Sequence, residues 1–82
     1  MEKDNLDCLN AIEFALSGKW DEAHRIDQKL KTPKAQWIHA VLHKIEGDES
    51  NSLYWYSRSS IVVYESYLDS IQELKAIKKR LK

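Results

Sequence analysis

Two histidines and a glutamate are spaced so that they could hold a metal ion or contact a ligand. His39 and His43 are four residues apart in the stretch WIHAVLHKIEGD, and Glu46 follows three residues later. On a helix, residues three and four apart are neighbours on one face. Two imidazoles at this spacing can chelate zinc, with a carboxylate as a third ligand. This histidine row is therefore the first candidate for a functional site.

Three interpretations of the row stay open: a metal site, a hydrogen-bonding or ligand-contact site, and a plain polar helix face. The row departs from the helical metalloprotease motif, because Ala40 stands where that motif has glutamate. His24 approaches the row only if its own helix runs antiparallel to this one. The row lies nearly opposite Val41 and Ile45, the centre of the apolar arc. This geometry favours the polar face if the helix is a lone surface helix, and a groove if another helix lines the same side. We predict no resident cofactor.

A second candidate surface comes from the aromatic triplet YWY at residues 54–56. Tyr56 shares a helix face with Ser52 and Leu53, so we expect it in the core. Tyr54, Trp55 and Arg58 point elsewhere and either pack under a neighbouring segment or form a partner-binding surface. Tyrosine, tryptophan and arginine are the residues that dominate interface hot spots.

The charge balance and the cysteine count exclude several classes of protein. Thirteen basic and thirteen acidic residues give a net charge of zero, which predicts neither a nucleic-acid nor a membrane partner. The single cysteine, Cys8, cannot form an internal disulfide and is expected to be a small buried residue. No secretory signal precedes the first helical pattern, so cytoplasmic localisation is the expectation.

Motifs for nucleophilic or phosphate chemistry are missing from the sequence, which favours a non-enzymatic protein. The carboxylate pairs at 21–22 and 48–49 fall in expected first helical turns, where they interact with the helix dipole. The basic tail KAIKKRLK suits a solvated helix C-terminus, and a contact with a polyanion is the alternative.

These residues would be positioned by helices, because apolar residues recur at helical spacing along most of the chain. The apolar arc of the third helix spans more than half its circumference, which predicts a central helix. Residues 60–68 are expected to form an extended loop packed on the helices or to continue the fourth helix. The expected helices cover residues 4–17, 20–31, 33–46, 48–59 and 69–81.

An internal repeat links the two halves of the helical pattern. Gly18 and Gly47 are 29 residues apart, and each is followed five positions later by a small residue, Ala23 or Ser52. This resembles the tetratricopeptide class, in which a glycine corner, an aromatic residue and a small residue mark a helix-turn-helix repeat of similar period. The resemblance covers about residues 5–59, with Pro33 opening the second hairpin, and it implies a fold rather than an activity.

The stretch from Trp37 to Ser59 also resembles a family of small proteins that share a W-I-H-A-x-L-H-K-x-E-G-D-x-x-N-x-x-Y-W-Y signature. That resemblance implies no activity. Its motif positions in this sequence are Trp37, His39, His43, Glu46, Gly47, Asp48, Asn51, Tyr54, Trp55 and Tyr56.

We therefore expect a single all-α domain over residues 1–82. Two antiparallel helical hairpins, at about 4–31 and 33–59, would stack, and the helix at 69–81 would cap their open face. The leading functional hypothesis is a small protein- or peptide-binding module, because stacked hairpins present a concave binding surface. The alternatives are a small-molecule or metal-binding protein that uses the histidine row, and a purely structural homo-oligomer.

Overall fold

The computed structural model describes residues 3–81, and within that range all regular secondary structure is helical, with no strand. The expected all-α class is confirmed. The elements are α1 (Lys3–Leu16), α2 (Trp20–Asp27), α3 (Pro33–Glu46), α4 (Glu49–Ser59), the short 3-10 helix η1 (Tyr64–Ser66) and α5 (Ser70–Leu81).

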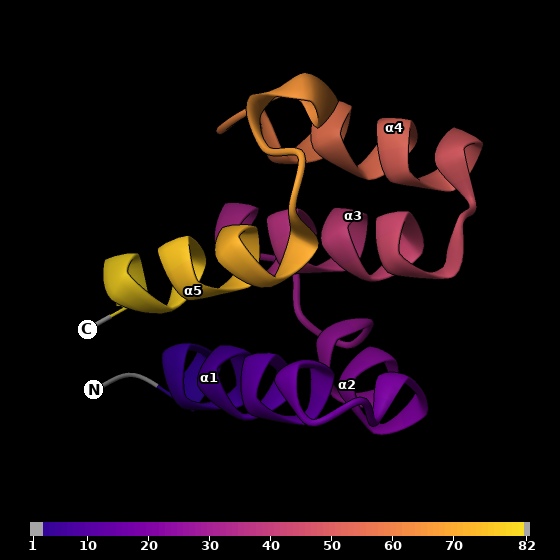
Figure 1. Ribbon diagram of the computed structural model, residues 1–82. Helices are drawn as coiled ribbons and strands as arrows, with labels where there is room; N and C mark the ends of the chain where they lie inside the picture. The colour runs from indigo at the N-terminus through magenta and orange to yellow at the C-terminus, as the bar shows by residue number, and fades with distance from the viewer. Residues whose placement is uncertain (1–2, 82) are drawn as a thin grey trace.

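Helix α3 lies at the centre of the molecule and contacts each of the four other α-helices (Figure 1). Its ends form where the sequence predicts them. Thr32 caps the start by accepting a hydrogen bond from the Ala35 amide at 3.2 Å, and Pro33 opens the first turn. Gly47 ends the helix with a φ of +87°, a left-handed conformation that glycine adopts without steric cost. The predicted central position of α3 is confirmed.

Helix α2 is shorter than expected, because it ends at Asp27 rather than near residue 31. The chain turns there, and the amide of Leu30 donates to the Asp27 carbonyl at 3.0 Å. Pro33 restricts the backbone of the residue before it to extended conformations, so the helix cannot run on into α3. Leu30 still packs against the core although it lies beyond the end of α2. The apolar pattern therefore predicted the burial of Leu30 correctly and the length of the helix incorrectly.

The segment at residues 60–68 forms a loop and does not continue α4. Ser60 takes a left-handed conformation, with a φ of +61°, and ends α4 there. The chain then runs past α4, makes one turn of 3-10 helix at η1 and reaches α5 (Figure 1). Asp69 caps α5 by accepting from the amide of Ile71 at 2.8 Å. Of the two predicted alternatives for this segment, the loop is the one observed.

The predicted apolar faces were partly wrong. Ile45, placed at the centre of the apolar arc of α3, is 42% exposed. His39 and His43, assigned to the opposite, polar side of α3, are only 8% and 9% exposed. The physical reason is that α2 and α4 both pack on α3 and cover the histidine side, while the far end of the apolar arc has no neighbour.

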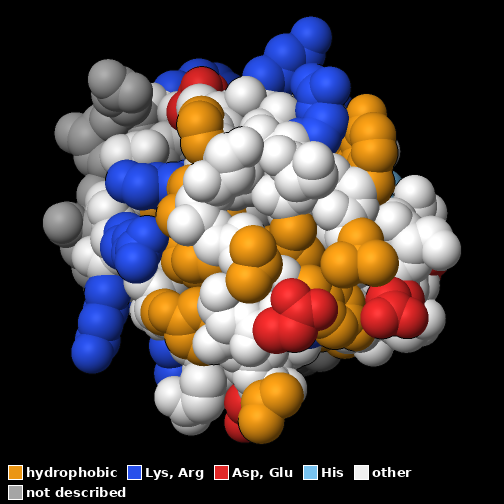
Figure 2. Space-filling model, turned by 90° about the horizontal axis from the view of Figure 1, so that it is seen from above, with side chains coloured by type: hydrophobic (Ala, Val, Ile, Leu, Met, Phe, Trp, Pro, Cys, Tyr) orange, Lys and Arg blue, Asp and Glu red, His pale blue; other side chains and the backbone are white. Residues whose placement is uncertain are grey.

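The face that carries α4 and the segment after it remains partly apolar. Figure 2 shows hydrophobic side chains gathered in the middle of this face, with lysines and arginines along its edge. Leu53 and Val63 are 44% and 61% exposed. Helix α5 packs on α1 and α3 and touches α4 through the Tyr56–Glu73 hydrogen bond, on the buried side of α4, so it leaves this face open. Among residues 3–81, no helix combines the length and the apolarity needed to cross a bilayer.

Candidate metal centre

All three histidines of the chain meet at the interface between α2 and α3. His24 comes from α2, and His39 and His43 lie one turn apart on α3. One ring nitrogen from each lies within 4.8 Å of the other two, and the Nε2 atoms of His39 and His43 are 3.1 Å apart. We call these three residues the histidine cluster. The sequence placed two of them in a row, and the packing of α2 against α3 adds the third.

Trp20 fixes His24 against α3. The indole of Trp20 stacks on the His24 ring at 4.8 Å with an interplanar angle of 8°. Its Nε1 also donates a hydrogen bond of 2.6 Å to the carbonyl of Leu42 on α3. Because Trp20 and His24 are one helical turn apart, this single side-chain contact sets both the rotation of α2 and the position of the imidazole.

Trp55 closes the cluster from the side of α4. Its indole stacks on His39 at 4.1 Å with an interplanar angle of 13°. The aromatic triplet therefore divides three ways. Trp55 joins the histidines, Tyr56 is buried as predicted, and Tyr54 is 52% exposed with the Arg58 guanidinium 5.9 Å from its ring centre. Of the predicted partner surface, only Tyr54 and Arg58 remain outward.

A carboxylate lies behind each of the two α3 histidines. Glu46 Oε2 is 2.6 Å from His43 Nδ1. Since an ionised carboxylate can only accept, the Nδ1–H of His43 donates, and its Nε2 keeps a lone pair directed at His39. Asp27 Oδ2 is 3.9 Å from His39 Nδ1, beyond hydrogen-bonding distance. Glu46, expected as a third ligand beside the two histidines, thus lies behind His43 instead.

Two of the three histidines, His24 and His39, are held in the neutral form that binds metals. Burial, and then the neighbouring His24 and His43, lower the pKa of His39 to about 4. Burial, followed by the proximity of His43, also lowers the pKa of His24. A metal ion competes with protons for the imidazole lone pair, so a lowered pKa favours metal binding at neutral pH.

Asp27 is the most unusual residue near the cluster. It is 1% exposed, and neither carboxylate oxygen has a hydrogen-bond partner within the described residues. Burial raises the pKa of Asp27 to about 8. Native proteins leave few buried polar atoms unpaired, because each costs free energy that nothing offsets. The sequence carried a signal for this residue: Asp27 follows Ala23 by four positions and so shares its buried helix face.

A second group of potential ligands consists of His43, Glu46 and Asp48. Asp48, however, caps α4, and its carboxylate accepts from both the backbone and the side-chain nitrogen of Asn51 at 3.3 and 2.7 Å. These hydrogen bonds from Asn51 lower the pKa of Asp48. Glu46 already accepts from His43. Both carboxylates therefore have structural partners, and the histidine cluster is the stronger metal candidate.

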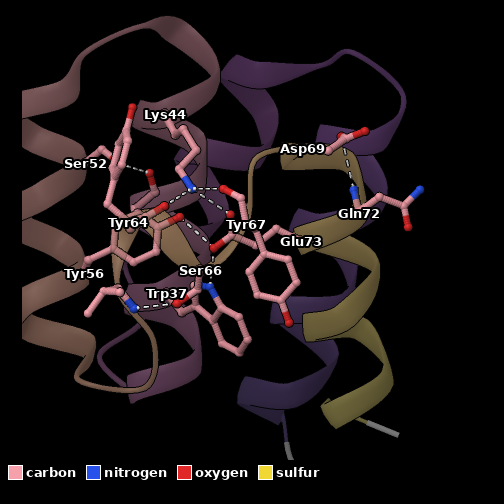
Figure 3. A network of polar contacts seen from close by, with 12 residues as sticks. Trp37, Lys44, Ser52, Tyr56, Tyr64, Ser66, Tyr67, Asp69, Gln72 and Glu73 are labelled. Atoms are coloured by element: carbon pink, nitrogen blue, oxygen red, sulfur yellow. Dashed lines mark hydrogen bonds and ion pairs between the residues drawn. The ribbon is translucent and has the colours of Figure 1, made fainter.

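A different polar cluster occupies the other side of α3 (Figure 3). Glu73 of α5 is fully buried and accepts hydrogen bonds from Trp37 Nε1 at 2.7 Å, from the Tyr56 hydroxyl at 2.6 Å and from Lys44 at 3.0 Å. We call these four residues the Glu73 network. Lys44 also donates to the carbonyl oxygens of Tyr64 and Tyr67. The network holds the loop and α5 against α3 and leaves no ligand position free.

An apolar groove of about 400 Å³ runs between the end of α4 and the loop that follows. It shares no residue with the histidine cluster. Its lining residues include Leu53, Tyr56, Ile61, Val62, Val63 and Tyr64.

Comparison with known proteins adds no relative. The chain matches no model of a protein family, no curated protein and no solved structure. The functional argument therefore depends on the site itself.

Proposed function

We propose that the protein binds one divalent transition-metal ion through His24, His39 and His43. The observation that carries the proposal is the 3.1 Å separation of the Nε2 atoms of His39 and His43, with a His24 ring nitrogen alongside. Zinc–nitrogen bonds of about 2.0–2.1 Å in a tetrahedral site require ligand nitrogens about 3.3 Å apart. The His39–His43 pair is already close to this spacing, and the His24 nitrogen, within 4.8 Å of the other two, has to move inward to complete the site.

Burial and ligand type support a metal of the zinc class. Three neutral imidazoles with no cysteine or methionine among them suit zinc, copper(II) or nickel rather than magnesium or calcium. Glu46 supplies the outer carboxylate that orients a histidine ligand and raises its basicity. A bound ion would also join α2 to α3 at three points, so metal binding is expected to stabilise the fold.

The test is metal binding by purified protein from which any affinity tag has been removed. We expect the wild type to retain one equivalent of zinc or cobalt(II) after dialysis, measured by elemental analysis and by competition with a chromophoric chelator. His24→Gln, His39→Gln and His43→Gln should each lower the affinity at least tenfold. Arg25→Gln, an exposed change on α2, is the matched control and should bind like the wild type.

Two results would sink the metal proposal. One is a wild type that retains no stoichiometric metal under conditions in which its helices are intact. The other is a wild type whose affinity is unchanged in all three histidine variants, since the metal would then lie elsewhere. Circular dichroism of each variant separates loss of ligand from loss of fold.

A peptide-binding role is the second candidate, and the apolar groove beside α4 is the observation that favours it. Leu53 and Val63 border the groove and are substantially exposed, as is Tyr54 nearby on α4. Peptides selected on the wild type by display should bind Leu53→Asp at least tenfold more weakly and His24→Gln equally well. Peptides that bind both variants like the wild type would exclude this groove as the binding surface.

The helices are further proposed to form two stacked hairpins of the tetratricopeptide kind. Gly18 and Gly47 both have positive φ, at +79° and +87°, and both stand at a corner between consecutive helices. Ala23 and Ser52, the small residues five positions after each glycine, are both fully buried. A scattering or crystallographic structure with other helix pairings would contradict this arrangement.

A further inference from the structure

Asp27 has no structural role that accounts for its burial. It is the last residue of α2, its side chain is fully enclosed, and both oxygens lack partners within residues 3–81. A buried carboxyl group in this position destabilises the fold relative to an apolar residue of the same size. Such groups, when they persist in a stable protein, are candidates for a functional role. The nearest side-chain nitrogen with which Asp27 is paired is Nδ1 of His39, at 3.9 Å.

We propose that Asp27 is the positioning residue for His39 in the metal centre. It accepts the Nδ1–H of that ring and so directs the Nε2 lone pair at the ion. The inference rests on the proposed metal-binding function and names the residue that prepares one of its three ligands.

The proton positions in the cluster explain why His39 needs this help. His43 donates from Nδ1 to Glu46, so in a neutral ring its Nε2 is an acceptor. The 3.1 Å contact between the two Nε2 atoms then requires His39 to donate from Nε2. Before His39 can bind a metal through that atom, its single ring proton must move from Nε2 to Nδ1.

Asp27 is the acceptor that makes this second tautomer favourable. In the metal-bound form the Nδ1–H of His39 faces Asp27 Oδ2, and a shift of about 1 Å brings the two atoms to hydrogen-bonding distance. Either oxygen of the Asp27 carboxyl group can accept this hydrogen bond, so its formation depends on the distance to His39 Nδ1. The two carboxyl groups thus orient the two α3 ligands in the same way. Glu46 already accepts a hydrogen bond from His43, and Asp27 accepts one from His39 when the metal ion binds.

The proposal predicts opposite effects on stability and on metal affinity. Asp27→Leu replaces an unpaired buried carboxyl with an apolar group of similar size, so the metal-free variant should unfold at a higher urea concentration than the wild type. The same variant should bind cobalt(II) about 10- to 100-fold more weakly, because loss of an outer-shell partner has this effect on metal sites. The cobalt absorption bands in the visible region should also shift, since they report ligand orientation.

A conservative variant and a double variant tie the effect to His39. Asp27→Asn keeps a carbonyl oxygen at the same place and should recover most of the affinity that Asp27→Leu loses. In a His39→Gln background, Asp27→Leu should cause no further loss. Glu22→Gln, which removes a carboxylate from the same helix, is the matched control and should bind cobalt like the wild type.

The outcomes distinguish this inference from the function on which it rests. Wild-type protein that binds no cobalt overturns both. Wild type that binds cobalt while Asp27→Leu binds it with equal affinity overturns only the role of Asp27. An Asp27→Leu variant that is less stable than the wild type without metal also overturns that role, because Asp27 would then be a structural residue.

Discussion

The histidine cluster and the Glu73 network are two buried polar groups on the same helix, and they differ in how completely their hydrogen bonds are satisfied. Glu73 accepts from three side chains, and Lys44 donates to Glu73 and two carbonyl oxygens. Next to the histidine cluster, both oxygens of Asp27 lack a hydrogen-bond partner within the described residues, and within the cluster the Nε2 atoms of His39 and His43 are paired with each other. The hydrogen bonds of the Glu73 network are all formed, whereas the region of the histidine cluster still contains a buried carboxyl group without a partner.

This difference supports the proposal that the histidine cluster binds a ligand while the Glu73 network is structural. A fully paired network fixes a unique packing, and here it positions the loop and α5 on α3. A partly paired cluster lowers stability unless something else binds to it. Burial and polarity alone would not have distinguished the two regions, whereas the state of each donor and acceptor does.

The largest effect is expected when the complete network loses its acceptor. Glu73→Ala removes the charge opposite Lys44, whose side chain is 8% exposed, and leaves an uncompensated buried ammonium group. Breaking a buried ion pair in this way typically costs about 3–5 kcal/mol of unfolding free energy. Urea denaturation followed by circular dichroism measures the loss, with the exposed Glu65→Ala as a control. A loss below about 1 kcal/mol would mean that the network does not hold α5 in place.

The pH dependence of metal-free stability gives the next largest effect. The folded pKa of His39, about 4, lies below its unfolded value of 6.5, so its contribution is full above pH 6.5 and is lost as pH falls to 4. The folded pKa of Asp27, about 8, lies above its unfolded value of 3.8, so its contribution is present at low pH and is lost as pH rises from about 4 to 8. Between pH 4 and 6.5 the two slopes oppose each other.

Asp27→Asn should therefore expose the histidine contribution. We expect the wild type to show a shallow profile between pH 4 and 6.5 and a decline from 6.5 to 8. In the variant, the free energy of unfolding should instead rise by up to about 3 kcal/mol as the pH increases from 4 to 6.5. Above pH 6.5 it should stay constant rather than decline. Urea titrations in the presence of a chelator measure both profiles. Identical profiles for the two proteins would show that burial does not raise the pKa of Asp27.

Metal binding should raise the free energy of unfolding and so offset the cost of the unpaired groups at the histidine cluster. With zinc at about 100 times its dissociation constant, linkage predicts a gain of about 2.7 kcal/mol, which corresponds to a rise of roughly 10–20 °C in the melting temperature of a domain this size. At the same zinc concentration, the rise in His24→Gln should be half that of the wild type or less, because a tenfold loss of affinity leaves about 1.4 kcal/mol of stabilisation. A conservative variant of the network, Tyr56→Phe, should melt earlier yet keep the full zinc-dependent rise, because the two regions are proposed to act independently.

The sequence indicated the helices and the histidine row because both depend on local periodicity. The ends of α3 depend on residues at its own termini, Pro33 and Gly47, and the structure confirms the predicted bounds. The approach of His24 to His39 depends on how α2 packs on α3, and no local pattern encodes that packing. For the same reason, the sequence left open whether the histidine side of α3 faces solvent or is covered by another helix.

The two buried carboxyl groups, Asp27 and Glu73, stand at positions that the apolar periodicity of the sequence marks as buried. Asp27 follows the buried Ala23 by one helical turn, and Glu73 precedes the buried Ile77 by one turn. An acidic residue on an otherwise apolar helix face is a sign of a buried polar group. Its partner, which decides between a structural and a functional role, comes from another helix and requires the fold.

The smallest expected effect concerns Trp55, which belongs to the incomplete cluster but donates no ligand. Its stack on His39 holds the ring plane, and aromatic stacking contributes about 0.5–1.5 kcal/mol beyond the area it buries. Trp55→Leu keeps an apolar group over the ring and removes the stacking, so zinc affinity should fall about three- to tenfold. Tyr54→Leu is the matched change one residue away, at a side chain that is 52% exposed, and should leave affinity unchanged. Equal affinities in both variants would mean that His39 is oriented from the Asp27 side alone, and the whole difference between the two regions would then lie in hydrogen bonding.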